Sequence, residues 1–244
     1  MEASLCRDQR SFRKACELLD RAYDTYSKLG ERHLAGRVLV NKGTCLGTAG
    51  EPKEAVTALE RGISLLEPDR DPQLVVVATQ SLLTALVDCG EFREAGQLLL
   101  ESGLRHSFAD DPSNLLRLRW VEAKILLGHG RLDETERVLG EVRAGFQEMG
   151  LDYDAALVGL DIAGVYLRQD RKSEVKGLAS DLYRTFEERG IHLEAIRALQ
   201  FFEVVCIKEV ANFRMAEEVR KFLGRLQGDP GLRFEPEQVI YRSV

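Results

Sequence analysis

Residues 38–68 read VLVNKGTCLGTAGEPKEAVTALERGISLLEP, and this stretch decides the fold. Apolar residues recur at three and four positions on both sides of the turn sequence AGEP, residues 49–52, which predicts two helices folded back on each other. Small residues stand where two such helices must touch, at Gly43, Gly47 and Ala55. The stretch therefore predicts a helical hairpin with close contact between its two helices.

The hairpin repeats along the chain with a period of 40 residues. Gly50, Gly90 and Gly130 each follow an apolar helical run, and the same register continues to Arg10 and Asp170. Small or β-branched residues follow five positions later, and apolar ones nine positions later: Ala15, Ala55, Ala95, Thr135 and Val175, then Leu19, Leu59, Leu99, Leu139 and Ala179. A second ladder marks the other turn at Gly30, Gly150 and Gly190, with Arg70 and Asp110 at the remaining positions. A repeat of this length indicates stacked supersecondary units, none of which is stable without its neighbours.

The helix boundaries follow from this register. The predicted pairs are 2–9 with 11–29, 31–49 with 52–66, 71–89 with 92–106, 112–129 with 132–149, 151–169 with 172–189, and 191–209 with 213–226. Ser11 is the expected N-cap of the second helix. The fold class is all-α, a right-handed α-solenoid of antiparallel helix pairs with about five and a half repeats over residues 1–227. Residues 228–244 should form an extended tail, with Leu232 and Phe234 covering the last helix pair.

The unit resembles a tetratricopeptide repeat (TPR), a family with small residues at its eighth and twentieth positions, Gly at the fifteenth and Pro near the end. Gly43, Gly50, Ala55 and Pro68 fill or nearly fill these places. The period is 40 rather than the family's 34, which resembles the longer TPR-like arrays of bacterial signal-responsive transcription regulators. The resemblance implies that the first helix of each pair lines a concave face that binds peptides.

Composition narrows the class of partner. The chain has 244 residues, 44% of them hydrophobic and 30% charged, with a net charge of -6. An acidic chain argues against general nucleic-acid binding, so we expect a basic partner or a neutral peptide. No signal peptide and no stretch near the ~20 apolar residues of a membrane span is evident. The five scattered cysteines predict reduced, mostly buried thiols in the cytoplasm, and no metal or cofactor site.

Counting along the first helices gives the candidate binding residues. They are Arg37, Asn41, Gln80, Thr84, Arg117, Trp120, Lys124 and Asp161, and the same count also turns Val40, Thr44, Val77, Ser81, Leu157, Leu160 and Arg168 inward. Their hydrogen-bond donors could hold a carboxylate or a peptide backbone. The carboxylate clamp of some TPR domains is not reproduced, because Val40 and Thr44 stand where Lys and Asn are needed. The alternative is a solvated helix face, with Trp120 packing between helices.

No residues form a catalytic constellation, so the expected function is binding. The chain is interpreted as a non-catalytic protein-interaction or scaffold module of a bacterial cytoplasmic regulator. Two alternatives stay open: a peptide- or ligand-sensing domain that controls an output domain, and a self-association module. The short predicted helix at 2–9 suggests that the array begins mid-repeat, behind an upstream domain. The sequence leaves the oligomeric state open.

Overall fold

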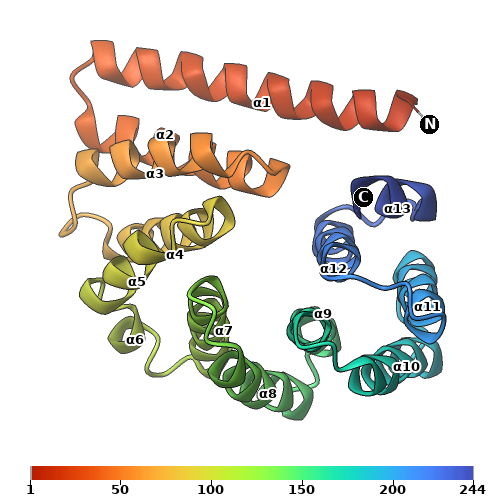
Figure 1. The fold of residues 1–244 in the computed structure, drawn as a ribbon. Coiled ribbons are helices and arrows are strands. Elements are labelled where there is room, and N and C mark those ends of the chain that lie inside the picture. Colours follow the sequence, from red (N-terminus) through yellow and green to blue (C-terminus); the bar gives the residue numbers. More distant parts are fainter. Residues whose placement is uncertain (1, 244) are drawn as a thin grey trace. The chain divides into compact units, whose positions relative to one another are not determined.

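A computed structural model describes the backbone of residues 2–243 and the side chains of residues 14–242 apart from Gly228. Within this range the chain forms thirteen α-helices and no strand (Figure 1). It divides into two compact units, Met1–Pro112 and Ser113–Val244, which are described separately below. The all-α prediction is confirmed, and successive helices pack as neighbours, as in an α-solenoid.

The first unit holds α1 (Glu2–Lys28), α2 (Arg32–Ala49), α3 (Pro52–Leu65), α4 (Pro72–Cys89), α5 (Phe92–Glu101) and α6 (Leu104–Ser107). α2 packs between α1 and α3, and α4 contacts both α3 and α2. Glycines permit the close approach of α2 to α3. A Cβ on Gly43 would lie 2.5 Å from Leu59 Cγ, and one on Gly36 would lie 2.9 Å from the Gly62 carbonyl oxygen. The hairpin predicted for residues 38–68 is confirmed.

The second unit holds α7 (Pro112–Gly128), α8 (Leu132–Glu148), α9 (Asp152–Arg168), α10 (Lys172–Glu188), α11 (Leu193–Ile207), α12 (Phe213–Gly228) and α13 (Pro236–Ser243). The predicted pairs in this region are confirmed to within about two residues at each end, which is the usual uncertainty of helix boundaries.

Both glycine ladders form left-handed turns. Gly50, Gly90 and Gly130 have φ of 85°, 81° and 75°, and the second ladder has positive φ at each of its glycines as well. Asp170 adopts the same conformation, with φ 56°, although it carries a side chain. The small positions five residues later are buried, with Ala55 at 0% and Thr135 at 1% exposure. The 40-residue register is therefore a structural period.

Two predicted helix boundaries in the first unit are wrong. α1 runs without a break from Glu2 to Lys28, so no separate helix covers 2–9 and the backbone is already helical at Ser11. The ladder position here is Arg10, a good helix former, instead of a turn-forming Gly. The expectation of an upstream domain loses this support and stays a prediction. The helix predicted for 92–106 is interrupted at Gly103, which has φ 64°.

The sixth pair is connected differently from a simple array. α9 is buried on every side along residues 155–160 and 162–165, and it packs against α8, α10 and α12. α11 lies beside α10, and it is α12 that lies beside α9 (Figure 1). Gly164 makes room for this contact, because a Cβ there would lie 3.0 Å from the Phe213 ring. α9 to α12 thus form a closed four-helix arrangement.

The chain after α12 is extended only as far as Glu235 and then forms α13, contrary to the prediction of an extended tail throughout. Leu232 and Phe234 pack against the core of the second unit, as predicted. The Phe234 ring lies 5.5 Å from Phe201 on α11 and 5.0 Å from Phe222 on α12, between ring centroids. Its backbone N–H donates to Glu194 Oε2 at 2.8 Å.

Among the described residues, α4 is long and apolar enough by length and composition to cross a membrane, which the sequence analysis did not anticipate. About a third of it is buried, and it packs against α2, α3 and α5. Apolar core helices pass the same test, so this is weak evidence for a membrane span.

Candidate functional site

The predicted binding residues fall into two sets, one in each unit. Arg37 and Asn41 are exposed on α2, and Thr84 is exposed on the neighbouring α4 beside the partly exposed Gln80. Thr84 Oγ1 donates to the Gln80 carbonyl within its own helix at 3.1 Å. The set therefore gives α2 and α4 exposed polar side chains. Among the described contacts, no hydrogen bond or ion pair links these residues between the two helices.

Val40 was predicted to face a groove, and this prediction is wrong. Its side chain is only 1% exposed. The reason is the close packing of α2 on α3, in which Val40 Cγ2 fills the space over Gly62.

The second set comes together in the second unit. Trp120 Nε1 on α7 donates to Asp161 Oδ2 on α9 at 2.7 Å, and Lys124 Nζ lies 4.8 Å from the centroid of the Trp120 ring. Arg117 Nη2 is 3.5 Å from Asp154 Oδ1 on α9. One face of α7 is thus joined to one stripe of α9 by a hydrogen bond and an ion pair.

Asp161 has a further partner that the sequence did not indicate. Arg220 Nε on α12 lies 3.0 Å from Asp161 Oδ1, with side-chain exposures of 19% for Arg220 and 12% for Asp161. One carboxylate therefore joins three helices. Arg220 was missed because the predicted array places α12 on the outside of the sixth pair, away from α9.

The position of α12 also corrects the expected inward face of α9. Leu157 and Leu160 are 6% and 1% exposed instead of open to a ligand. Arg168 remains exposed at the end of α9, where its Cζ lies 3.9 Å from the centroid of the Phe213 ring on α12. Phe213 thus holds the guanidinium in place through a cation–π contact.

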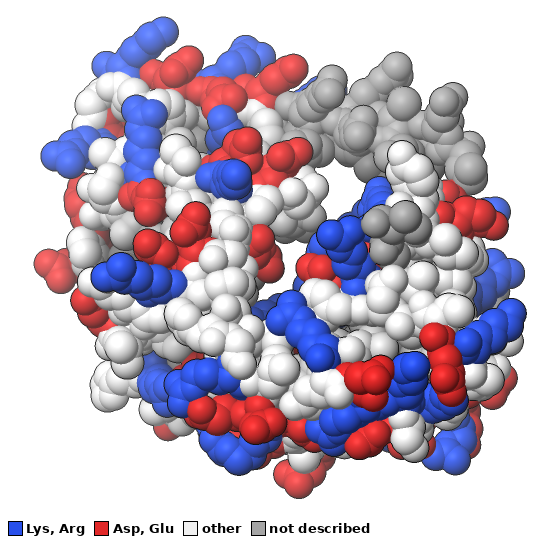
Figure 2. Space-filling model, viewed as in Figure 1, with Lys and Arg blue, Asp and Glu red and all other residues white. Residues whose placement is uncertain are grey.

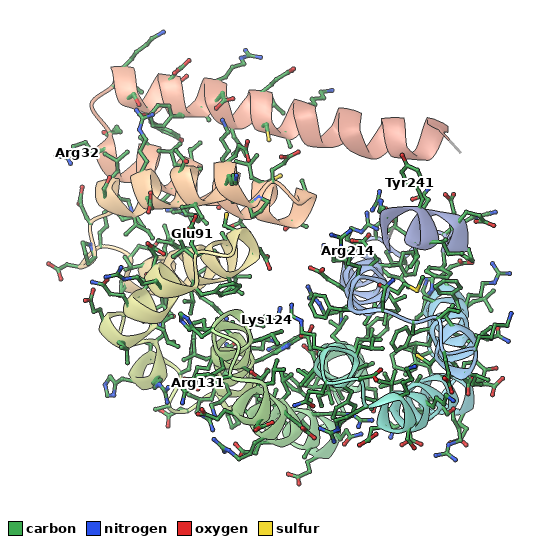
Figure 3. All side chains as sticks on the ribbon, in the orientation of Figure 1. Arg32, Glu91, Lys124, Arg131, Arg214 and Tyr241 are labelled. Carbon is green, nitrogen blue, oxygen red and sulfur yellow. The ribbon has the colours of Figure 1, made fainter. Side chains whose placement is uncertain are left out.

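We define the α7–α9–α12 face as Arg117, Trp120, Lys124, Asp161, Arg168, Phe213, Arg214 and Arg220. Lys and Arg side chains gather over α9 and α12 in Figure 2, and Figure 3 labels Lys124 on α7 and Arg214 on α12. Trp120 also makes an edge contact with the buried Phe146, with ring centroids 6.2 Å apart. The ring is therefore partly a packing residue and partly accessible from this face.

A separate cavity of about 380 Å³ lies between α8 and α9. It is lined by Asp133, Glu136, Arg137, Gly140, Glu141, Ile162 and Tyr166. Two of its carboxylates are paired with arginines: Arg171, from outside the lining, binds Glu136, and Arg119, also from outside it, and Arg137 bind Glu141. The hydrogen bond from Arg119 lowers the pKa of Glu141, which keeps this carboxylate ionised. These contacts are those of a surface ion-pair network around the cavity.

Thiols and metal-binding groups offer little chemistry in the part of the chain with described side chains. Cys206 is buried, and burial raises its pKa to about 12, so it packs as a neutral thiol. Cys16, Cys45 and Cys89 are free and half-buried, and Cys6 lies outside the described side chains. Across the described residues, no three His, Cys, Asp or Glu side chains come together in a way that could hold a metal ion.

The comparison with known families agrees with this architecture. Residues 2–67, which comprise α1, α2 and α3, match the model of the tetratricopeptide repeat. This part of the chain is similar to a tetratricopeptide repeat. Beyond the matched residues, the helices of each unit again pack as neighbours, up to the closure of α12 on α9 in the second unit. No curated protein matches the chain.

TPR repeats generally mediate protein–protein interaction and are typically non-catalytic. In an array of this kind, binding depends on side chains that several helices present on one surface. The α7–α9–α12 face presents side chains from three helices, and the exposed polar residues of the first unit come from α2 and α4.

Proposed function

We propose that this TPR-like chain is a non-catalytic interaction module that binds a segment of a partner protein on its α7–α9–α12 face. The observation that carries the proposal is the three-helix junction at Asp161, which holds Trp120 and Arg220 in fixed positions at a partly exposed surface. Tryptophan and arginine contribute most to protein interfaces, especially when they are held in place before binding.

The geometry also explains how the face could gain affinity. The Trp120 ring is oriented by its hydrogen bond to Asp161 and by the edge of Phe146. Arg168 is oriented by the Phe213 ring. Because these side chains lose little freedom when a partner docks, more of the contact energy appears as binding.

Trp120 provides the experimental test, because it is the only tryptophan in the chain. A random peptide library is selected on the full chain, and the selected peptides are titrated while Trp120 emission is recorded. We expect binding peptides to change this emission. We also expect calorimetry to show much weaker binding to Trp120→Ala, with Tyr241→Ala on α13 as the control for an exposed aromatic outside the face.

Lys124→Glu serves as a second variant, since Trp120→Ala removes packing against Phe146 and could loosen the unit. Circular dichroism checks that each variant keeps its helices. The proposal fails if peptides bind without changing Trp120 emission and bind equally to both face variants.

The roles in a bacterial regulator and in the cytoplasm stay predictions, as do ligand sensing and self-association. A thermal-shift screen with metabolites tests sensing, and light scattering tests self-association.

A further inference from the structure

We infer that the partner segment taken by the α7–α9–α12 face is acidic, an inference that rests on the proposed function of this face. The net charge of the whole chain is -6, which by itself favours a basic or neutral partner. Residues 113–244 contain 20 Lys and Arg against 22 Asp and Glu, so this unit too is slightly acidic as a whole. The charge of the face is opposite to that of its surroundings.

Asp161 and the carboxylates next to the face are already paired inside the unit. Asp161 is bound by Trp120 and Arg220, and Asp154 is bound by Arg117. Glu217, one turn into α12, is 3.2 Å from Lys221 Nζ. These negative charges are neutralised locally and leave little field to repel an incoming anion.

Two guanidinium groups of the face, those of Arg168 and Arg214, have no ion pair with a carboxylate among the described side chains. Arg168 contacts the Phe213 ring, and Arg214 is exposed at the adjacent position of α12. Within the described side chains, the ion pairs give neither of them a carboxylate partner. Arg168 contacts Phe213, the first residue of α12, and Arg214 is the second, so both cations belong to the part of the face at the N-terminal end of α12.

Guanidinium groups bind carboxylates through paired hydrogen bonds, and they are more weakly hydrated than ammonium groups. Arg168 is held over an aromatic ring before binding, which reduces the entropy lost when it binds a carboxylate. Acidic residues in an extended or helical segment could therefore bind Arg168 and Arg214, while the Trp120 ring is held at Asp161, about two turns of α9 away. A nucleic acid fits less well, since it needs a longer basic surface than these few cations provide.

The test uses the same selection on the full chain, with sequencing of the selected peptides. We expect Asp and Glu to be enriched over the unselected library. We expect the double variant Arg168→Glu, Arg214→Glu to bind the selected peptides at least about tenfold more weakly. The matched control combines Arg184→Glu on α10 with Lys208→Glu just after α11, which changes the net charge equally and should bind as the parent does.

Salt and a second variant sharpen the test. Binding should weaken as salt is raised, because exposed charges are screened over shorter distances. Arg214→Glu alone keeps the contact between Arg168 and Phe213, so a loss of binding in this variant cannot be ascribed to disturbed packing of α9 on α12.

The outcomes separate the inference from the proposed function. Peptides that change Trp120 emission but show no acidic enrichment, and that bind the double variant normally, overturn the inference and leave the proposed function standing. The absence of any peptide that reports through Trp120 overturns both. A single-stranded oligonucleotide that binds as tightly, with the same loss in the double variant, also overturns the inference, because the face would then take polyanions in general.

Discussion

Asp170 forms the left-handed turn of the repeat without a glycine. The equivalent positions at 50, 90 and 130 are glycines with positive φ, and Asp170 adopts the same left-handed conformation with φ 56°. A side chain in this region costs about 1–2 kcal/mol, because Cβ approaches the following carbonyl oxygen. The turn after α9 is therefore held in place by the packing of its helices, at a cost that the glycine turns of the ladder do not carry.

We predict that Asp170→Gly stabilises the second unit by about 1 kcal/mol, because glycine relieves this strain. Thermal melting followed by circular dichroism measures the shift. Gly130→Ala is the converse control and should destabilise by a similar amount. An unchanged or lowered melting temperature for Asp170→Gly would contradict the strain at this turn.

Gly43 tests the close contact of α2 and α3. We predict that Gly43→Ala destabilises the first unit by about 1–3 kcal/mol, since the new methyl group would overlap Leu59 and force the helices apart. Gly177→Ala on α10 is the matched control. Nothing lies within 4 Å of its Cβ position, so that change should be neutral or stabilising by about 0.5–1 kcal/mol. Equal effects of the two substitutions in chemical denaturation would rule out the predicted overlap.

The burial of single residues was predicted best at positions that the 40-residue period places at the contact between helices. Ala55, Ala95 and Leu59 are buried as the register requires. Val40, Leu157 and Leu160 were placed wrongly, because the count along a helix assumes that only one side of it is covered. Trp120 and Asp161 were chosen independently for their positions, and their direct hydrogen bond could not be read from a spacing of 41 residues.

At the scale of elements, the closure of α12 on α9 determines the site. It brings Arg220 to Asp161 and Phe213 to Arg168. The helical periods of α11 and α12 do not indicate which of these two helices packs against α9. A usable signal was present in α9 itself, whose residues 155–160 are apolar or small on all sides, as in a helix surrounded by others.

The segment after α12 packs on the outside of α11 and α12 through Phe234. We predict that Phe234→Ala destabilises the second unit by about 2–4 kcal/mol, because it removes a ring packed on both Phe201 and Phe222. Tyr241→Ala, at a side chain 85% exposed, should leave stability nearly unchanged. Thermal melting of both variants checks this. A Phe234→Ala variant as stable as the parent would mean that the segment does not stabilise α11 and α12.

The C-terminal segment also shows which features sequence patterns do not predict. The packing of Leu232 and Phe234 was predicted from their isolated apolar character. α13 was not, because residues 236–243 are too few for a helical period to stand out. The helix forms against α12, where Val239 is buried and Arg242 lies 3.2 Å from Glu218.

For the whole molecule, the sequence was sufficient for the class of fold and for most helix pairs, because stacked repeats state the same pattern several times. It was insufficient for the proposed binding surface. That surface depends on the packing of α12 on α9, which departs from the repeat. Because this packing occurs at only one helix pair, no repeated sequence pattern predicts it. The net charge of -6 describes the chain as a whole and still predicts a basic or neutral partner, whereas the proposed face is locally basic.

Hydrogen–deuterium exchange of the full chain, with and without a selected peptide, tests the central claim most directly. The account predicts that the peptide slows exchange in α7, α9 and the first turns of α12, around Trp120, Asp161 and Arg214. Slower exchange confined to α2 and α4 of the first unit, with α7, α9 and α12 unchanged, would contradict it.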